Sequence, residues 1–337
     1  MMEVITTDNS RRWDEIIRSM YAYDFYHLAS YHRLDQSGKP LLLYFANGTE
    51  SLAFPVILRN IEGTEYKDIG SVYGYAGPLS QKENPSASNI RLFHNELKFF
   101  FDSNQIVSAF TRLHPIMENQ SSFLADLGEV ETLNTTVGID LELPEIDQKK
   151  QYSRSLKYRI NYLKRKGASV VKASNKEEID IFIEIYKENM NRVNATHLYY
   201  FSPDYFYSIL KNIDSCILLA IYDGEFVSGS LCTFCNGIMQ AHLNATRDKF
   251  LHLSPLKLVL DQARIEGKKE NMKWLHLGGG RSGADDSLFV FKSRFSNNYF
   301  KFKVWKYIHN QAVYDMFIDG KYQKGTSSFF PLYRNRE

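Results

Sequence analysis

The stretch Leu275-His-Leu-Gly-Gly-Gly-Arg-Ser-Gly-Ala-Asp-Asp-Ser-Leu-Phe-Val-Phe-Lys-Ser-Arg-Phe-Ser296 lies near the C-terminal end of the sequence. An apolar run at 274–277 is typical of the end of a buried strand. Consecutive glycines follow, and they suit a backbone that bends sharply or lies close to a ligand. Bare N–H groups beside a strand end, with Lys292 further along, can hold an anion or a developing oxyanion. The alternative is a glycine-rich turn with charged residues on a solvated face, because the stretch matches neither GxGxxG nor the P-loop.

The composition indicates a large, nearly neutral protein. The chain has 337 residues, of which 44% are hydrophobic and 14% aromatic, so it is long for one domain and two domains are expected. The 41 basic and 39 acidic residues leave a net charge of +2. Bulk charge therefore gives no reason to expect a DNA-binding protein, although a local basic patch remains open.

The three cysteines are too few for a disulfide framework and indicate a reducing compartment. Residues 1–12 are polar and no apolar run approaches 18 residues, so we expect a cytoplasmic protein without a membrane span. Cys232-x-x-Cys235 suggests zinc, but a structural site needs four ligands and only Cys216 remains. Both cysteines also lie within a predicted strand, where positions i and i+3 face opposite sides. No metal is expected.

The first half reads as a mixture of helices and strands. Apolar residues at helical spacing predict a helix after Ser10 and another at 90–100. Asn47-Gly48 between two apolar runs predicts a hairpin. Further strands are predicted at 105–113 and 136–143.

The second half begins after a basic amphipathic helix at 154–166, which we expect to end at Gly167. Ser174-x-x-Glu177 predicts a capping box, and Asp223-Gly224 and Asn236-Gly237 predict the turns of a meander. Pro255 opens another helix. The order of elements recurs in both halves, so we expect a mixed α/β protein with largely antiparallel sheets. We expect two similar lobes, with the site in the cleft between them. The predicted boundaries are 1–147 for the first lobe, 148–167 for the linking helix and 168–337 for the second lobe.

Six segments in register resemble a known family. The segments are 73–78, 111–115, 164–167, 199–202, 254–258 and 276–280 with 291–295. Together they resemble the FemA/FemB-like branch of the GNAT acyltransferase superfamily. This branch comprises the peptidoglycan-bridge aminoacyltransferases and their relatives. The resemblance implies two GNAT-like lobes, the first for the acceptor and the second for the donor and the catalysis. It also implies an acyltransferase that moves an acyl or aminoacyl group to an amine.

The acceptor implied by the resemblance is a cell-envelope or glycan precursor, either nucleotide-linked or lipid-linked, such as a sugar or muropeptide. One alternative is an aminoacyl-tRNA-dependent ligase of the peptidoglycan-bridge type, with tRNA as a partner. A second alternative is a catalytically silent protein that binds the precursor. The oligomeric state is not predicted.

The donor is either acyl-CoA or aminoacyl-tRNA. Ordinary GNAT enzymes hold the coenzyme A pyrophosphate in a glycine-containing loop before a helix N-terminus. The matching stretch here, 246–254, contains no glycine. Arg247, Lys249 and Ser254 are the residues predicted to bind a donor phosphate. If the donor is aminoacyl-tRNA, the basic helix at 154–166 is expected to meet its phosphates.

The resemblance assigns the oxyanion to Lys292, and acylation also requires a base for the amine proton. The candidates for the base are Asp285 and His276, with Asp286 and His242 as further options; a strand histidine such as His242 is more often a satisfied core residue. Arg112 is expected to bind an acceptor phosphate. Tyr73 and Tyr75 either line the acceptor pocket or form a packed turn. The full set predicted to bind substrate is Tyr73, Tyr75, Arg112, His114, Arg159, Tyr200, Gly278, Gly279, Gly280, Arg281 and Phe295.

Overall fold

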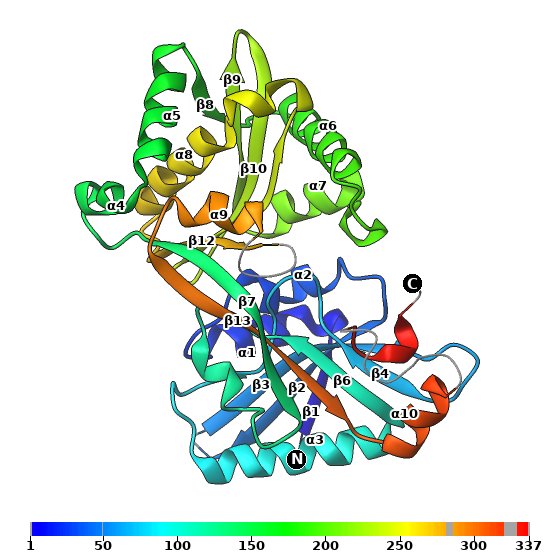
Figure 1. The fold of residues 1–337 in the computed structure, drawn as a ribbon. Helices are drawn as coiled ribbons and strands as arrows, with labels where there is room; N and C mark the ends of the chain where they lie inside the picture. Colours follow the sequence, from blue (N-terminus) through cyan, green and yellow to red (C-terminus); the bar gives the residue numbers. More distant parts are fainter. Residues whose placement is uncertain (1, 49, 281–285, 320–328, 336–337) are drawn as a thin grey trace. The chain divides into compact units, whose positions relative to one another are not determined.

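The computed structural model describes residues 2–48, 50–280, 286–319 and 329–335. The chain forms two compact units, Met1–Leu133 with Lys301–Glu337, and Asn134–Phe300. It enters the second unit within β7 (Glu129–Asp140) and leaves it within β13 (Asn298–Ile308) (Figure 1). These limits differ from the expected boundaries in two ways. The basic helix belongs to the second unit, and the C-terminal residues return to the first.

The first unit contains one mixed sheet with the strand order β1-β2-β3-β4-β6-β13, and β5 also pairs with β3. β4 and β6 are parallel, whereas the neighbouring pairs are antiparallel. The strands are β1 (Met2–Thr6), β2 (Lys39–Asn47), β3 (Glu50–Asn60), β4 (Lys67–Gly70), β5 (Leu79–Ser80) and β6 (Ile106–Arg112).

The second unit repeats this order of pairing in its own strands. Its sheet runs β8-β9-β10-β11-β12-β7, with β11 and β12 parallel and the other pairs antiparallel. In both units a helix joins the parallel pair, because parallel neighbours require a crossover connection. The expectation of a mixed α/β protein with largely antiparallel sheets is confirmed. The strands are β8 (Ser169–Lys172), β9 (Ser215–Tyr222), β10 (Glu225–Cys235), β11 (Ile238–Thr246) and β12 (Trp274–Gly279).

The predicted hairpin turns are confirmed. Asn47-Gly48 joins β2 to β3, and Gly48 has a φ of 61°. Both residues of Asp223-Gly224 (52° and 75°) and of Asn236-Gly237 (44° and 81°) have positive φ. Turns of this kind match the twist of the strands that they connect.

The helices begin at side-chain caps where the local sequence supplies them. Ser153 accepts a hydrogen bond from Leu156 N at the start of the basic helix, and Gly167 follows its end with a φ of 81°. The cap of the next helix is Asn175 rather than the predicted Ser174. The helices are α1 (Ser10–Arg18), α2 (Ala29–His32), α3 (Ala87–Ser103), α4 (Glu145–Gln151), α5 (Arg154–Arg165), α6 (Lys176–Arg192), α7 (Pro203–Asn212), α8 (Leu256–Lys269), α9 (Ser287–Ser293) and α10 (Gln311–Ile318).

Among the residues described, no helix combines the length and apolar character needed to cross a membrane. The same part of the chain contains no cluster of three or more His, Cys, Asp or Glu side chains able to hold a metal ion.

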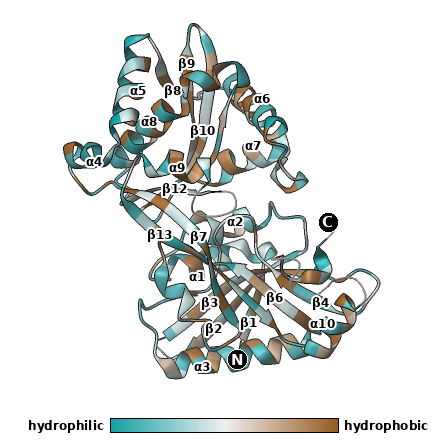
Figure 2. Cartoon of the chain, viewed as in Figure 1, coloured by the Kyte–Doolittle hydropathy of each residue, from teal (hydrophilic) through white to brown (hydrophobic). Residues whose placement is uncertain are grey.

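One buried core of the second unit lies between its sheet and the pair α5 and α8. Leu156, Ile160 and Leu163 of α5 are buried there with Leu258 and Val259 of α8. Figure 1 shows α6 and α7 on the other side of the same strands. Hydrophilic residues are prominent along α5 and α6 in Figure 2. The apolar stripe predicted for the basic helix is therefore a packing surface.

The side chain of Leu156 tests this packing. Leu156 is fully buried, whereas Tyr158 on the same helix is 63% exposed. Because Leu156→Ala leaves a cavity, we expect a loss of about 2–5 kcal/mol in the free energy of unfolding. Tyr158→Ala is expected to change it by less than about 1 kcal/mol. Denaturant unfolding measures both, and equal effects would contradict the assigned core.

Candidate active site

The parallel pairing of β11 with β12 ends part-way along β11. Its last partners are Gln240 and His276, yet β11 continues to Thr246. β12 instead follows β7, with a register shift between His276 and Gly278. Gly278 has a φ of 74°, a conformation that side chains rarely adopt. The glycines therefore turn the end of β12 away from the ladder with β11.

β11 is irregular just beyond Gln240, its last residue paired with β12. Leu243 lies opposite Leu231 and Ala241 lies opposite Cys232, so His242 is an extra residue of β11. His242 Nε2 lies 2.8 Å from the Tyr205 hydroxyl of α7. Bulges of this kind re-aim side chains and are frequent beside active sites.

Lys292 lies against the glycines at the end of β12. Its ammonium donates a hydrogen bond of 2.7 Å to the carbonyl oxygen of Gly279. Desolvation lowers the pKa of Lys292 to about 8, although the Asp286 carboxylate opposes the shift. The ammonium is therefore largely protonated near neutral pH. A fixed cation at a strand end can stabilise an anion there.

Asp286 holds α9 beside the same glycines. Its carboxylate accepts a hydrogen bond of 2.7 Å from Phe289 N and so caps the helix. A side chain at Gly280 would collide with this carboxylate. Apolar spacing did not predict α9, although Asp286, three residues before Phe289, was a capping signal. Two predicted site residues, Arg281 and Asp285, lie outside the described residues.

His276 is only 1% exposed and lies between two neighbouring strands. Nδ1 lies 2.7 Å from Gln240 Oε1, and Nε2 lies 2.9 Å from Thr136 Oγ1. Both ring nitrogens therefore have partners. A role for His276 as the base stays a prediction, and it requires one of these hydrogen bonds to be exchanged.

Phe295 is fully buried in the core of the second unit, edge-on to Tyr152 at 5.5 Å. Its contact with a substrate stays a prediction, and it requires this packing to open. Tyr200 is 42% exposed, and its hydroxyl donates to Asn191 Oδ1. Arg159 is half-buried over the Tyr162 ring.

The residues predicted to bind the donor phosphate are paired with other groups. Arg247 forms an ion pair of 3.1 Å with Glu188, and Lys249 forms one of 2.9 Å with Glu225. Ser254 has a left-handed backbone before α8. Binding a phosphate through Arg247 or Lys249 would therefore require the anion to displace a carboxylate.

In the first unit, His114 is part of a buried polar network. It is 2% exposed; Nε2 lies 3.1 Å from Asp24 Oδ2, and its backbone N–H donates to Gln120 Oε1. Binding of substrate by His114 stays a prediction, and it requires this network to open. Arg112, two residues earlier, remains half-buried with its guanidinium over the Phe110 ring at 5.4 Å.

The segment with Tyr73 and Tyr75 packs against the same network. The Tyr75 ring lies edge-on to His114 at 5.8 Å, and the Tyr73 carbonyl oxygen accepts a hydrogen bond from Tyr31. Gly77, at a φ of 108°, allows the backbone to lie against Gln120. These contacts favour the packed turn over a pocket lining.

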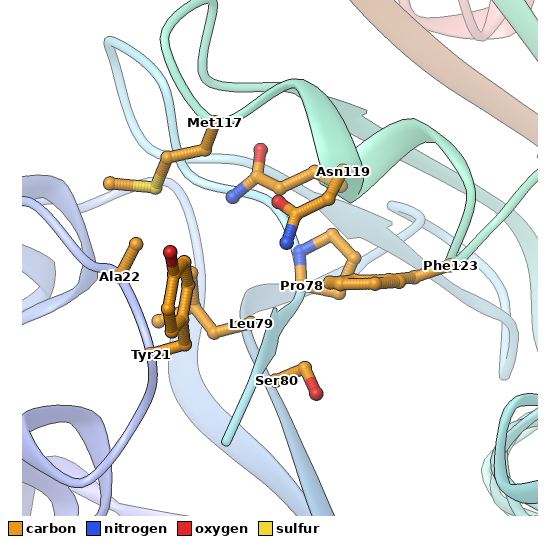
Figure 3. Close-up of a pocket in the computed structure, with 9 residues that line it drawn as sticks. Tyr21, Ala22, Pro78, Leu79, Ser80, Met117, Asn119 and Phe123 are labelled. Atoms are coloured by element: carbon orange, nitrogen blue, oxygen red, sulfur yellow. The ribbon is translucent and has the colours of Figure 1, made fainter. Parts of the chain in front are cut away.

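A small cavity lies beside this segment (Figure 3). Its volume is about 10 Å³, which accommodates no more than about one water molecule. It is too small for a nucleotide-linked precursor. The lining residues are Tyr21, Ala22, Pro78, Leu79, Ser80, Met117, Asn119, Gln120 and Phe123.

Two further histidines of the first unit are buried and neutral. Desolvation lowers the pKa of His27 to about 4 and that of His32 to about 3. His32 Nε2 lies 3.0 Å from the Tyr26 carbonyl oxygen. Within the described part of the chain, His32 Nδ1 has no hydrogen-bond partner, so the neutral ring is the form that the site accommodates.

The burial of neutral His32 predicts that the folded protein loses stability in acid. As the pH falls below about 6.5, an unfolded histidine gains a proton that folded His32 does not accept until about pH 3. Stability is therefore lost over this interval, by up to about 1.4 kcal/mol per pH unit for one histidine. We expect His32→Gln to reduce the slope of unfolding free energy against pH between 7.5 and 5. His252→Gln, at an exposed position, is the control. An unchanged slope in His32→Gln would contradict the assignment.

Comparison with known proteins shows similarity in structure only. No protein-family model and no curated protein matches the sequence. The fold is similar to that of FemX, with a TM-score of 0.72 and 13% identity over 94% of this chain and 99% of FemX. It is also similar to L-PGS from Bacillus licheniformis (TM-score 0.59, 13% identity, 90% of this chain and 93% of that one).

A third similar structure is the C-terminal domain of a putative lysylphosphatidylglycerol synthetase from Agrobacterium fabrum, with a TM-score of 0.57 and 13% identity. That similarity covers 92% of this chain and 96% of the domain. The resemblance that the six sequence segments predicted is thus confirmed at the level of the fold, and the chain has the fold of FemX.

Proposed function

We propose that this protein transfers an acyl or aminoacyl group to an amine of a cell-envelope or glycan precursor. The observation that carries the proposal is the Lys292 ammonium on the Gly279 carbonyl, at the point where β12 has left β11. The fold shared with FemX and with the C-terminal domain of a putative lysylphosphatidylglycerol synthetase supports it, since the second name denotes the synthesis of an aminoacylated phospholipid.

The chemistry assigns a distinct task to each group. The amine nitrogen attacks the carbonyl carbon of the donor, and the carbonyl electron pair moves to the oxygen. Lys292 and the backbone N–H groups of the glycine segment stabilise this oxyanion. Collapse then re-forms the carbonyl and breaks the bond to the leaving group, a thiolate of coenzyme A or a ribose oxygen of tRNA. The attacking nitrogen loses its proton to a base.

We propose His276 and Asp285 as candidates for this base. His276 is close to the glycines in sequence and is held by Gln240 and Thr136, so it can accept a proton only after giving up a hydrogen bond. A donor or acceptor group that takes the proton itself would need neither residue.

The first unit is the proposed acceptor-binding part and the second the proposed donor-binding part. Arg112 is the first-unit residue that we assign to an acceptor phosphate, because a guanidinium binds phosphate through two hydrogen bonds. It is half-buried and lies over an aromatic ring, which limits its conformations.

The aminoacyl-tRNA-dependent reaction is the second candidate, and one observation favours it. Arg247 and Lys249, the cations of the stretch that replaces the coenzyme A loop, are paired with carboxylates. In contrast, Arg154, Lys157 and Arg165 on α5 are exposed. Exposed cations along one helix suit the phosphates of RNA.

Replacing Lys292 tests the transfer reaction. If its charge stabilises the oxyanion, Lys292→Met should lower kcat by about 100-fold or more while donor affinity persists. The wild-type rate should fall as the pH rises through about 8, because the ammonium loses its proton there. Lys292→Arg should keep part of the rate and move this decline to higher pH. The measurement is turnover of acyl-CoA and aminoacyl-tRNA donors with amine-bearing precursors.

Lys269→Met, at an exposed position of α8, is the control and should retain full turnover. Unchanged kcat in Lys292→Met would refute the assigned role. Calorimetry with acetyl-CoA and longer acyl-CoAs then separates the donors. Saturable binding that weakens on replacing Arg247 and Lys249 supports acyl-CoA. Absence of binding excludes it and leaves aminoacyl-tRNA or a catalytically silent binding protein.

A further inference from the structure

The position of the short helix α9 depends on the contacts at its two ends. α9 has seven residues, fewer than the about 12–15 that an isolated helix needs to be even marginally stable in water. Its N-terminal end is capped by the Asp286 carboxylate. Lys292 lies at the other end, as the last residue but one. The place of the Lys292 side chain therefore depends on what holds the residues directly after α9.

The segment that follows α9 is held by Gln151, the last residue of α4. Gln151 Oε1 accepts a hydrogen bond of 2.9 Å from the Ser296 hydroxyl and one of 3.2 Å from Asn297 N. Ser296 is fully buried, and its hydroxyl oxygen in turn accepts a hydrogen bond of 3.1 Å from Asn298 N. One amide oxygen thus ties three successive residues to the end of α4.

The two residues that follow α4 contact the same segment. Ser153 N donates a hydrogen bond of 2.9 Å to the Arg294 carbonyl oxygen. The Tyr152 ring lies edge-on to the buried Phe295 ring, with 5.5 Å between the centroids. Phe295 N donates a hydrogen bond of 3.0 Å to the Lys292 carbonyl oxygen. The contacts therefore continue up to the backbone of Lys292.

The hydrogen bond of 2.7 Å from the Lys292 ammonium to the Gly279 carbonyl oxygen requires this placement. A lysine side chain is long and flexible, so one hydrogen bond fixes its ammonium only if the backbone is also held. A displacement of about 1 Å at a catalytic group can cost about 100-fold in rate. Groups that hold the backbone of a catalytic residue are therefore part of the site, even when they do not touch the substrate.

We propose that Gln151 is a positioning residue, which holds residues 296 and 297 and thereby keeps the Lys292 ammonium at the Gly279 carbonyl. Gln151 itself is assigned no contact with a substrate. The effect on catalysis rests on the transfer reaction proposed above, whereas the position of the ammonium does not.

The first test measures the environment of the ammonium without any turnover. Competitive labelling of the full chain with acetic anhydride over a range of pH, read by mass spectrometry, gives the pKa of Lys292. We expect about 8 in the wild type, where the ammonium is desolvated and Asp286 is the charged group that acts on it. Gln151→Met, which offers no amide oxygen, should raise this pKa above about 9, toward the ordinary value of about 10.4. Ser296→Ala should raise it in the same direction. Gln151→Glu, whose carboxylate accepts both hydrogen bonds, should keep it below about 9.

Turnover is the second measurement. Gln151→Met should lower kcat about tenfold or more and leave the KM for the donor within about twofold, because the donor does not contact this side chain. Gln151→Glu should keep most of the wild-type rate. Lys150→Met, at the neighbouring exposed position of α4, is the matched control and should equal the wild type in both measurements.

Thermal unfolding is measured in parallel, because Gln151→Met leaves two donors without their acceptor. A lower Tm alone, with the pKa of Lys292 and kcat unchanged while the variant is folded, would make Gln151 a purely structural residue and overturn the proposal. If Gln151→Met does not fold, the same result in Ser296→Ala overturns it. If the wild type turns over no donor, the proposed function fails, and the labelling still decides the role of Gln151. A raised pKa with unchanged kcat would keep the positioning and refute the use of Lys292 in transfer.

Discussion

The short parallel ladder between β11 and β12 is the constraint on which the proposed active site depends. Hydrogen bonding between the two strands ends at Gln240 and His276, and the chain beyond must satisfy its backbone elsewhere. β12 does so by following β7, and Gly278 permits the turn. The Gly279 carbonyl then receives the Lys292 ammonium. The end of a strand, a bulge in its neighbour and the half-buried Lys292 ammonium therefore lie at one place in the second unit.

The second unit holds the cations of Arg264 and Lys292 in different ways. Arg264 is neutralised by Asp261 and hydrogen-bonded to Tyr152, an arrangement typical of a structural ion network. Lys292 is hydrogen-bonded to a neutral carbonyl and keeps its charge near neutral pH. Only an uncompensated charge can attract an anion strongly, so Lys292 carries the functional proposal and Arg264 does not.

The first unit shows how motif residues can serve the fold instead of a ligand. His114, Asp24 and Gln120 form a buried network, and the loop with Tyr75 packs on it. Buried polar groups must find partners, and here they find one another. Among the first-unit residues assigned to substrate, this leaves Arg112 as the clearest candidate for contact with a ligand.

The sequence alone determined the features that depend on neighbouring residues. Asn236-Gly237 specifies its turn because both residues tolerate positive φ, and the stripe of Leu156, Ile160 and Leu163 specifies which side of α5 is buried. The recurring order of elements likewise indicated two similar mixed α/β units, and Lys292 was singled out beside the glycines that it contacts.

Only the tertiary structure decided the features that depend on distant partners. His276 meets Thr136 across 140 positions of sequence, and Phe295 packs on Tyr152, so neither burial was visible in local spacing. The pairing of Arg247 with Glu188 has the same origin. Periodicity reports which face of an element is apolar, whereas the partner of each polar group is set by how the whole chain folds.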